Sequence, residues 1–122
     1  MLPNNDEELQ DLLELAKAFF KSMDFVIQRE IDVVGTSGKK HHFEMILKTN
    51  SDLEINQLYV KIVDWKRAVG VDRLIRFERI LNDLNDRKGM IVSNLFSDSA
   101  VKFAKRRGLI IYAREHLEIQ ED

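Results

Sequence analysis

The sequence has no cysteine, a single proline and no long hydrophobic run in its 122 residues. The absence of cysteine excludes disulfide bonds, thiolate zinc sites, iron–sulfur clusters and a cysteine nucleophile. The apolar runs fall far short of the roughly 20 residues that span a bilayer, and the first residues are acidic, unlike those of a secretory signal. We therefore expect a soluble, cytoplasmic protein that does not insert into a membrane.

The residues that are present suffice for one compact domain. Hydrophobic residues make up 44% of the chain and charged residues 33%. A chain of this length buries roughly two-thirds of the surface that its unfolded form exposes, so a core forms without disulfides or bound metal. No internal repeat or low-complexity linker divides the sequence. We expect residues 1–122 to form a single domain.

Charge is distributed unevenly along the chain. The formal net charge is −2, but residues 1–60 hold 6 basic and 11 acidic residues, whereas residues 61–114 hold 13 basic and 6 acidic residues. A concentration of Lys and Arg in an acidic protein indicates a surface that binds a polyanion, because phosphate contacts need several cations on one face. Solvated helix faces carry the same residues, so charge alone leaves both interpretations open.

The hydrophobic periods of the first half predict a helix followed by a β-hairpin. Residues 6–23 place apolar side chains at three- and four-residue steps, with acidic residues in the first turn. Residues 25–33 and 42–48 alternate between apolar and polar side chains, and turn residues from Gly35 to Gly38 separate them. We expect the apolar residues of each strand to share one face: Phe25, Ile27, Ile31 and Val33 in the first, and Phe43, Met45 and Leu47 in the second.

The second half predicts alternating strands and helices. Residues 58–65 are apolar on both faces, which is typical of a central strand. A helix over 71–86, a buried strand over 89–92, a helix capped by Ser97 and ended by Gly108, and a last strand over 109–112 follow. Parallel strands joined by a helix require a right-handed crossover. The expected fold class is α/β, with helices on both faces of a mixed five-stranded sheet made of an antiparallel meander and a strand–helix–strand unit.

Charged residues on the predicted strands are the candidates for chemistry. Asp64 and Lys66 close the predicted central strand, two residues apart and therefore on one face. Glu44 lies on the preceding strand, within two residues of the position that would face Asp64. Two carboxylates held close together favour a hard divalent cation such as Mg²⁺, and a nearby lysine assists the attacking water in phosphodiester hydrolysis.

The spacing of one acid, any residue and one lysine is not specific by itself. It also occurs in Asp86-Arg87-Lys88, at the end of a predicted helix with no paired acid on a preceding strand, and we discard that match. Asp64 and Lys66 are equally compatible with a surface ion pair at the exposed end of a strand. The spacing alone therefore leaves a catalytic and a purely structural interpretation open.

Several local sequences occur along this order of elements: Glu44, Asp64-Trp65-Lys66, Val69-Gly70-Val71, Lys88 to Ser93, Phe96-Ser97, Ala100, Ala104 and Gly108-Leu109-Ile110. Together they resemble the Mrr-like restriction endonuclease domain of the PD-(D/E)XK nuclease superfamily. The resemblance covers residues 9–117 and is strongest over 59–112. It implies a restriction-endonuclease-like, three-layer α/β/α fold and a metal-dependent nuclease that acts on DNA.

The resemblance also implies roles for single residues. Glu44 corresponds to the first metal-binding acid, Asp64 to the second and Lys66 to the catalytic lysine, with Mg²⁺ or Mn²⁺ as the metal ion. Glu14 is the nearest candidate for an additional acid in the first helix. Asp32 is the alternative to Glu44 as the first acid, and we favour Glu44 because its strand directly precedes the central strand.

Two functions remain open at this stage. One is a Mg²⁺-dependent DNA endonuclease, and the other is a catalytically degenerate module that keeps the nuclease fold and binds nucleic acid or a protein partner. Glu44 stands where the family usually has Asp, which keeps the second function open. His42 is a candidate contact to a phosphate or a metal-bound water. A lone domain of this size that cuts both strands would act as a homodimer. The expected phosphate contacts are Lys39, Lys40, Arg67, Arg73 and Arg76.

Overall fold

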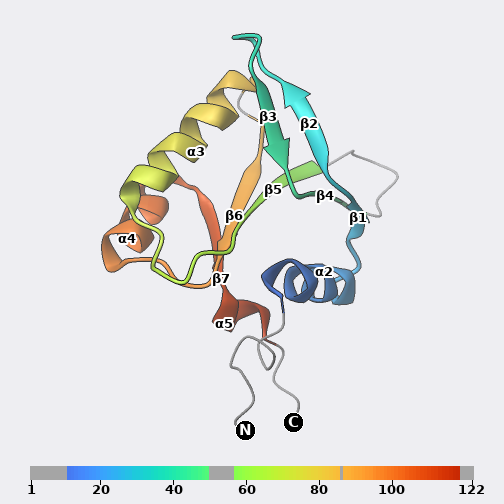
Figure 1. The fold of residues 1–122 in the computed structure, drawn as a ribbon, viewed down its shortest axis with the longest axis vertical. Helices are drawn as coiled ribbons and strands as arrows, with labels where there is room; N and C mark the ends of the chain where they lie inside the picture. Colours follow the sequence, from blue (N-terminus) through green and yellow to red (C-terminus); the bar gives the residue numbers. More distant parts are fainter. Residues whose placement is uncertain (1–10, 50–56, 86, 119–122) are drawn as a thin grey trace, which may run out of the picture.

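A five-stranded sheet forms the centre of the molecule in the computed structural model, which describes residues 11–49, 57–85 and 87–118 (Figure 1). The strand order is β1-β4-β5-β6-β7, with antiparallel pairing from β1 to β5 and parallel pairing from β5 to β7. The predicted mixed sheet is therefore confirmed. The strands are β1 (Val26–Gln28), β4 (Met45–Lys48), β5 (Gln57–Val63), β6 (Gly89–Ser93) and β7 (Ile110–Ala113).

Helices cover both faces of this sheet (Figure 1). On one face lie α2 (Leu12–Ser22) and the short α5 (Arg114–Leu117), and on the other lie α3 (Val71–Asp83) and α4 (Asp98–Arg107). The α4 boundaries agree with the sequence, because the Ser97 hydroxyl accepts a hydrogen bond from the Ala100 N–H and Gly108 ends the helix at φ 69°. Residues 6–10 of the predicted first helix lie outside the described residues.

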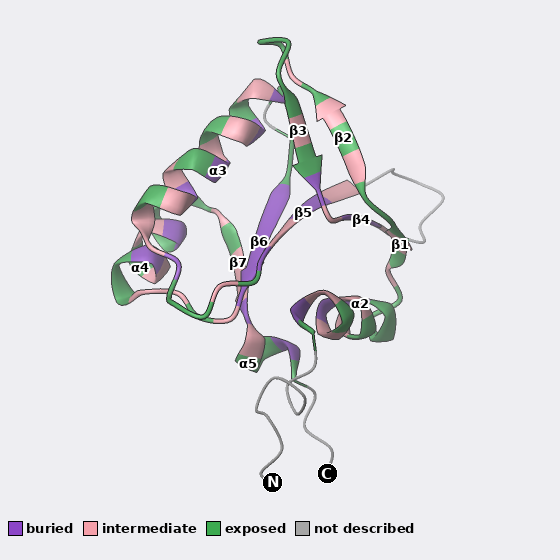
Figure 2. Ribbon diagram, viewed as in Figure 1, coloured by how far each residue is buried: buried purple, intermediate pink, exposed green. Residues whose placement is uncertain are grey.

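Each face of the sheet has its own hydrophobic core (Figure 2). The strand β6 lies between them and is buried at every position, because helices cover both of its faces. The core on the α3 and α4 side includes Phe43, Ile46, Leu74, Phe77 and Ile91. The core on the α2 side includes Leu12, Phe20, Met45, Leu47 and Val60.

The predicted hairpin exists, but it is bent in the middle. Its outer part, β2 (Ile31–Val34) and β3 (Lys40–Phe43), forms a separate two-stranded sheet. The pairing Val26↔Lys48 in the inner part and Ile31↔Phe43 in the outer part keeps one register. The interruption falls at residues 29–30 on one strand and at Glu44 on the other.

The expectation that each strand keeps one apolar face is wrong because of this bend. Phe25, Ile27, Met45 and Leu47 pack on the α2 side, whereas Ile31, Val33 and Phe43 pack on the α3 side. The outer hairpin leans against α3, so its apolar residues find partners there. A bend reverses which face is buried without changing the alternation in sequence, and the periodicity does not reveal it.

The turn of the hairpin is attached to the end of α3 through Asp83. The Asp83 carboxylate accepts hydrogen bonds from the Thr36 hydroxyl, the Ser37 N–H and hydroxyl, and His41 Nε2, at 2.7–3.0 Å. The Asp83 carbonyl also accepts from the Thr36 N–H at 2.9 Å. These contacts fix the direction in which the outer hairpin projects.

Other differences from the sequence prediction concern element ends. The central strand β5 ends at Val63, so Asp64 and Lys66 follow the strand instead of closing it. The helix α3 ends at Asp83, β7 begins one residue late, and α5 was not anticipated. No helix within the described residues is long and apolar enough to cross a membrane.

Candidate functional site

Glu44 lies at the bend between β3 and β4, beside the central strand. Its Oε1 accepts a hydrogen bond from the Ile62 N–H at 2.6 Å. Its Oε2 lies 3.8 Å from Lys61 Nζ and 3.6 Å from His42 Nε2. The side chains of Glu44 and Lys61 are only 20% and 19% exposed, so this is a largely desolvated charge centre.

His42 connects Glu44 to Asp32, the alternative first acid. His42 and Asp32 are cross-strand partners on β3 and β2, and His42 Nδ1 lies 2.8 Å from Asp32 Oδ1. The two acids considered for one role therefore lie on opposite sides of one imidazole ring. Asp32 is exposed on the outer hairpin, whereas Glu44 adjoins the main sheet.

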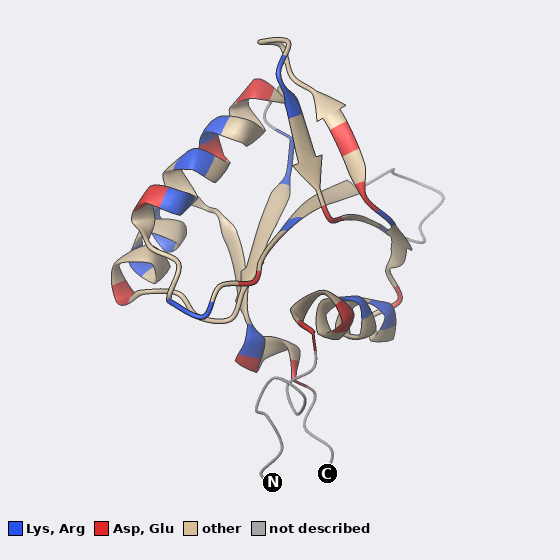
Figure 3. Cartoon of the chain, in the orientation of Figure 1, with Lys and Arg blue, Asp and Glu red and all other residues tan. Residues whose placement is uncertain are grey.

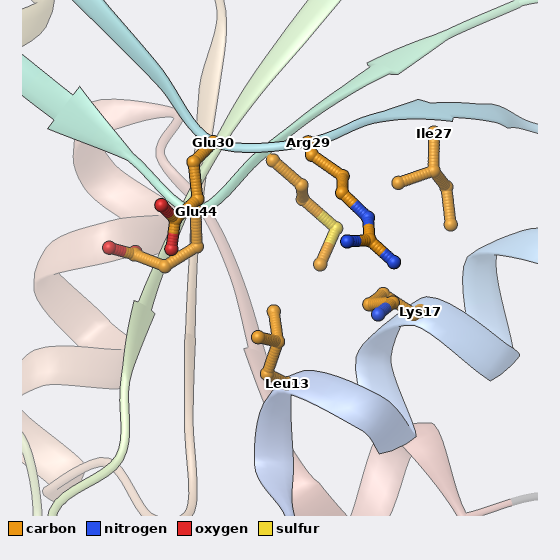
Figure 4. Close-up of a pocket in the computed structure, with 7 residues that line it drawn as sticks. Leu13, Lys17, Ile27, Arg29, Glu30 and Glu44 are labelled. Carbon is orange, nitrogen blue, oxygen red and sulfur yellow. The ribbon is translucent and has the colours of Figure 1, made fainter.

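A pocket of about 320 Å³ opens beside Glu44, between α2 and the inner part of the hairpin (Figure 4). Its charged lining consists of two carboxylates, Glu30 and Glu44, and two cations, Lys17 and Arg29. Leu13, Ile27 and Met45 supply its apolar lining. Sequence reasoning missed Lys17, Arg29 and Glu30. Arg29 and Glu30 could have been found in the sequence, because they are consecutive charged residues in a predicted strand that otherwise alternates between apolar and polar side chains.

Arg73 approaches Glu44 from the first turn of α3. Burial lowers the pKa of Arg73, the charge of Arg76 lowers this pKa further, and Glu44 acts in the opposite direction. The Arg76 charge thus repels that of Arg73, and the attraction of Glu44 for Arg73 offsets this repulsion only in part. Basic and acidic residues are interspersed along α3 (Figure 3). Arg73 and Arg76 belong to the first two turns of this helix.

Asp64 belongs to a different set of contacts, at the carboxyl ends of the parallel strands. Asn94 Nδ2 donates to Asp64 Oδ1 at 2.8 Å and to the Trp65 carbonyl at 2.7 Å. Arg114 Nε in turn donates to Asn94 Oδ1 at 2.7 Å. This network connects the ends of β5, β6 and β7, and it had no signal in the sequence because it depends on the order of the strands.

The structure does not make Asp64 the cross-strand partner of Glu44. The pairing of Met45 with Val60 places Lys61 opposite Glu44, and Lys61 Nζ also donates to the His42 carbonyl at 2.8 Å. Asp64 is three residues further along, a distance of roughly 10 Å in an extended chain. Lys66 follows in the exposed bend after β5.

The remaining predicted residues are dispersed around this centre. Arg67 is exposed and stacks over the Trp65 ring, with its guanidinium carbon 4.4 Å from the ring centroid. Lys39 and Lys40 are exposed at the turn of the outer hairpin. Glu14 is exposed on α2 and forms an ion pair with Lys17 at 2.9 Å.

The residues around Glu44 do not fit a divalent metal ion. Mg²⁺ and Mn²⁺ need several oxygen ligands with an excess of negative charge. Here the two carboxylates of the pocket share its lining with two cations, Lys17 and Arg29, and Lys61 adds a further positive charge beside Glu44. Across residues 11–49, 57–85 and 87–118, no group of three or more His, Asp or Glu side chains is arranged to hold a metal.

The family of the chain follows from comparison with known proteins. Residues 5–118 match the family model described as restriction endonuclease (Mrr_cat). The chain therefore belongs to the restriction endonuclease family, as the sequence resemblance implied. No curated protein sequence matches the chain.

Solved structures with the same fold include nucleases. A protein of unknown function, AF1548, aligns at a TM-score of 0.72 with 13% identity, over 86% of this chain and 62% of that one. A repair endonuclease from Pyrococcus abyssi aligns at 0.59 with 15% identity, over 86% and 47%. The DNA modification-dependent restriction endonuclease AspBHI aligns at 0.53 with 13% identity, over 96% and 37%.

These likenesses establish the restriction-endonuclease-like fold and leave the activity open, because the identities are low. The chain spans 62% of the length of AF1548 and less than half of the two nucleases. The activities of those longer proteins are therefore not assigned to this chain.

Proposed function

We propose that this chain is a DNA-binding domain of the restriction endonuclease family in which the Glu44 centre does not catalyse metal-dependent hydrolysis. The proposal rests on one observation, the two cations that act on the Glu44 carboxylate. Lys61 and Arg73 both face Glu44, and Arg76 adds its charge to that of Arg73. A phosphate of the DNA backbone would pair with these positive charges.

The flank of α3 that carries Arg73 and Arg76 is the surface on which we propose that DNA binds. Arg73 is half-buried, so its charge is poorly screened and strengthens contact with an anion. Lys39, Lys40 and Arg67 are proposed as outer phosphate contacts, since all three are exposed. Such contacts supply affinity and position the duplex without reading its sequence.

Binding of a fluorescein-labelled duplex, followed by fluorescence anisotropy without divalent metal, tests this proposal. The variant Arg73→Gln/Arg76→Gln should bind at least about tenfold more weakly, since each charge-assisted hydrogen bond contributes roughly 1.5–3 kcal/mol. The matched control, Lys102→Gln/Lys105→Gln, removes the same charge from the exposed side of α4 and should retain most of the affinity. Equal losses in both variants, or no binding by the wild type, would reject the proposed surface and favour a protein partner.

Family membership favours a second candidate, a metal-dependent DNA endonuclease. In this candidate Glu44 and Asp64 hold Mg²⁺ or Mn²⁺, and Lys66 assists the attacking water. Binding both carboxylates to one ion requires Asp64 to leave Asn94 and approach Glu44.

Nicking of supercoiled plasmid with Mg²⁺ or Mn²⁺ separates the two candidates. We expect no metal-dependent nicking by the wild type. Nicking that is lost in Glu44→Gln, Asp64→Asn and Lys66→Ala would establish the endonuclease instead. In that case, the homodimer needed to cut both strands becomes testable by light scattering of the DNA complex.

A further inference from the structure

Lys61 is the cross-strand neighbour of Glu44 on the central strand. Continuation of the pairing Met45↔Val60 by one step brings Lys61 opposite Glu44, and the hydrogen bond from the Ile62 N–H to Glu44 Oε1 agrees with this register. The Lys61 ammonium is held in place, 3.8 Å from Glu44 Oε2 and 2.8 Å from the His42 carbonyl oxygen that accepts its hydrogen bond.

The next residue on the same face of β5 is Val63, which is 4% exposed and packs in the core beside α3. The stretch that faces Glu44 and continues along this strand is therefore Lys61-Ile62-Val63. The resemblance to the nuclease superfamily implies an acid, any residue and a lysine on this strand. Judged by register instead of by sequence spacing, the acidic position holds a lysine and the lysine position holds a valine.

From this we infer that Lys61 occupies the position of the second carboxylate, that its ammonium is the resident cation of the Glu44 centre, and that the charge at position 61 decides whether the centre binds a divalent metal. The inference deepens the proposed function by naming the residue that replaces the metal. It concerns binding of the metal alone and does not require that DNA binds.

The physical basis is that an ammonium group and a divalent ion compete for the same place beside Glu44. Two adjacent carboxylates repel each other and gain stability when a divalent ion joins them. One carboxylate beside an ammonium is already neutralised. Compared with a site of two carboxylates, this site offers a divalent ion one ligand fewer and places a positive charge close to the ion. The small exposed fraction of Glu44 and Lys61 strengthens this repulsion, because solvent screens it poorly.

Isothermal titration with MnCl₂ in the absence of DNA tests this inference on the full chain. The wild type should show no binding that depends on Glu44, whereas Lys61→Glu should bind Mn²⁺ at least about tenfold more tightly than any residual binding by the wild type. Adding Glu44→Gln to Lys61→Glu should abolish the gain. Lys61→Gln removes the charge without adding a carboxylate and should bind Mn²⁺ more weakly than Lys61→Glu.

Two results would overturn the inference. One is Mn²⁺ binding by the wild type that Glu44→Gln abolishes. The other is a Lys61→Glu protein with wild-type circular dichroism and unfolding midpoint that binds Mn²⁺ no better than the wild type. If Lys61→Glu does not fold, comparison of Lys61→Gln with the wild type still decides. Tighter Mn²⁺ binding by Lys61→Gln supports the inference, and equal Mn²⁺ affinity of the two proteins rejects it. DNA binding is measured without metal, and metal binding is measured without DNA. The proposed function can therefore fail while this inference holds, and this inference can fail while the proposed function holds.

Discussion

At the scale of single residues, two acids, Glu44 and Asp83, have different tasks. Glu44 is largely buried and is shared among Lys61, His42 and a backbone N–H, whereas within the described residues the Asp83 carboxylate bonds only to the hairpin turn and β3. Ser37 and His41 both bond directly to Asp83, so the carboxylate is the centre of the cluster. This differs from a nucleophilic triad, in which the histidine is central.

The contact of Asp83 with the hairpin turn predicts an acid-dependent loss of stability. Hydrogen bonds from His41 first, then from Ser37 and Thr36, hold the pKa of Asp83 well below its usual range. A depressed pKa in the folded state stabilises the fold above the unfolded value of about 4, and this stabilisation is lost as the pH falls toward the folded value. The urea midpoint of the wild type should therefore fall more steeply between pH 6 and pH 3 than that of Asp83→Asn.

Comparing the urea midpoints of the wild type and Asp83→Asn across this pH range separates the effect of Asp83 from that of the other acids. Every other carboxyl contributes equally to both curves, so their difference reports the contact between Asp83 and its partners, His41 included. Asp83→Asn should have the lower midpoint at pH 7, and the gap should narrow on acidification. Parallel curves over the whole range would contradict the assignment.

At the scale of elements, the bend of the hairpin creates the candidate site. Glu44 interrupts the strand between β3 and β4, and residues 29–30 interrupt the opposite strand. The bend opens the pocket next to α2 on one side and brings the outer hairpin onto α3 on the other. A straight hairpin would expose Ile31, Val33 and Phe43, so the hydrophobic effect favours the bend.

The packing of α3 on the sheet depends on one glycine. A Cβ atom added at Gly89 on β6 would lie 2.6 Å from Leu81 Cδ2, 2.9 Å from Phe77 Cζ and 3.1 Å from the Tyr59 carbonyl oxygen. Gly89→Ala should therefore lower the free energy of unfolding by about 1–3 kcal/mol, the usual cost of overpacking a core. Chemical denaturation measures this value.

The matched control is Gly70→Ala at the beginning of α3. A Cβ atom there meets nothing within 4 Å, and the backbone is extended at φ −101°. This variant should cost less than about 1 kcal/mol, since it changes only the residue that precedes the helix. If the two variants were equally stable, close packing between β6 and α3 would not be the limiting contact.

At the scale of the whole molecule, the charge that matters is regional. The formal net charge of −2 would not favour a polyanion, yet the basic residues gather in the second half of the chain and at the hairpin turn. Long-range attraction depends on this local distribution more than on the total. The acidic residues are divided almost equally between the two halves, so the uneven distribution comes from the basic residues.

This distribution predicts strong salt dependence of DNA binding. If Lys39, Lys40, Arg67, Arg73 and Arg76 each neutralise one phosphate, the plot of log K against log salt should have a slope of about −4 to −5. Lys39→Gln/Lys40→Gln should reduce the slope by about 2. Anisotropy titrations from 50 to 300 mM KCl measure both slopes. A slope near zero would mean that phosphate contacts do not carry the binding.

The sequence by itself determined the class of fold and most elements, because these depend on local periods and caps. Ser97 and Gly108 marked α4 correctly, and the buried strand β6 followed from a short apolar run. The family resemblance also needed only the sequence, and the family match agrees with it.

The tertiary structure alone decided which charges meet. Counting along the chain placed Asp64 near Glu44, but the strand register put Lys61 there and moved Asp64 to Asn94. A shift of three residues in pairing changes a pair of acids into an acid and a base, while the local sequence stays the same. Register is set by the packing of both sheet faces and by the bend at Glu44, which are contacts between residues distant in sequence.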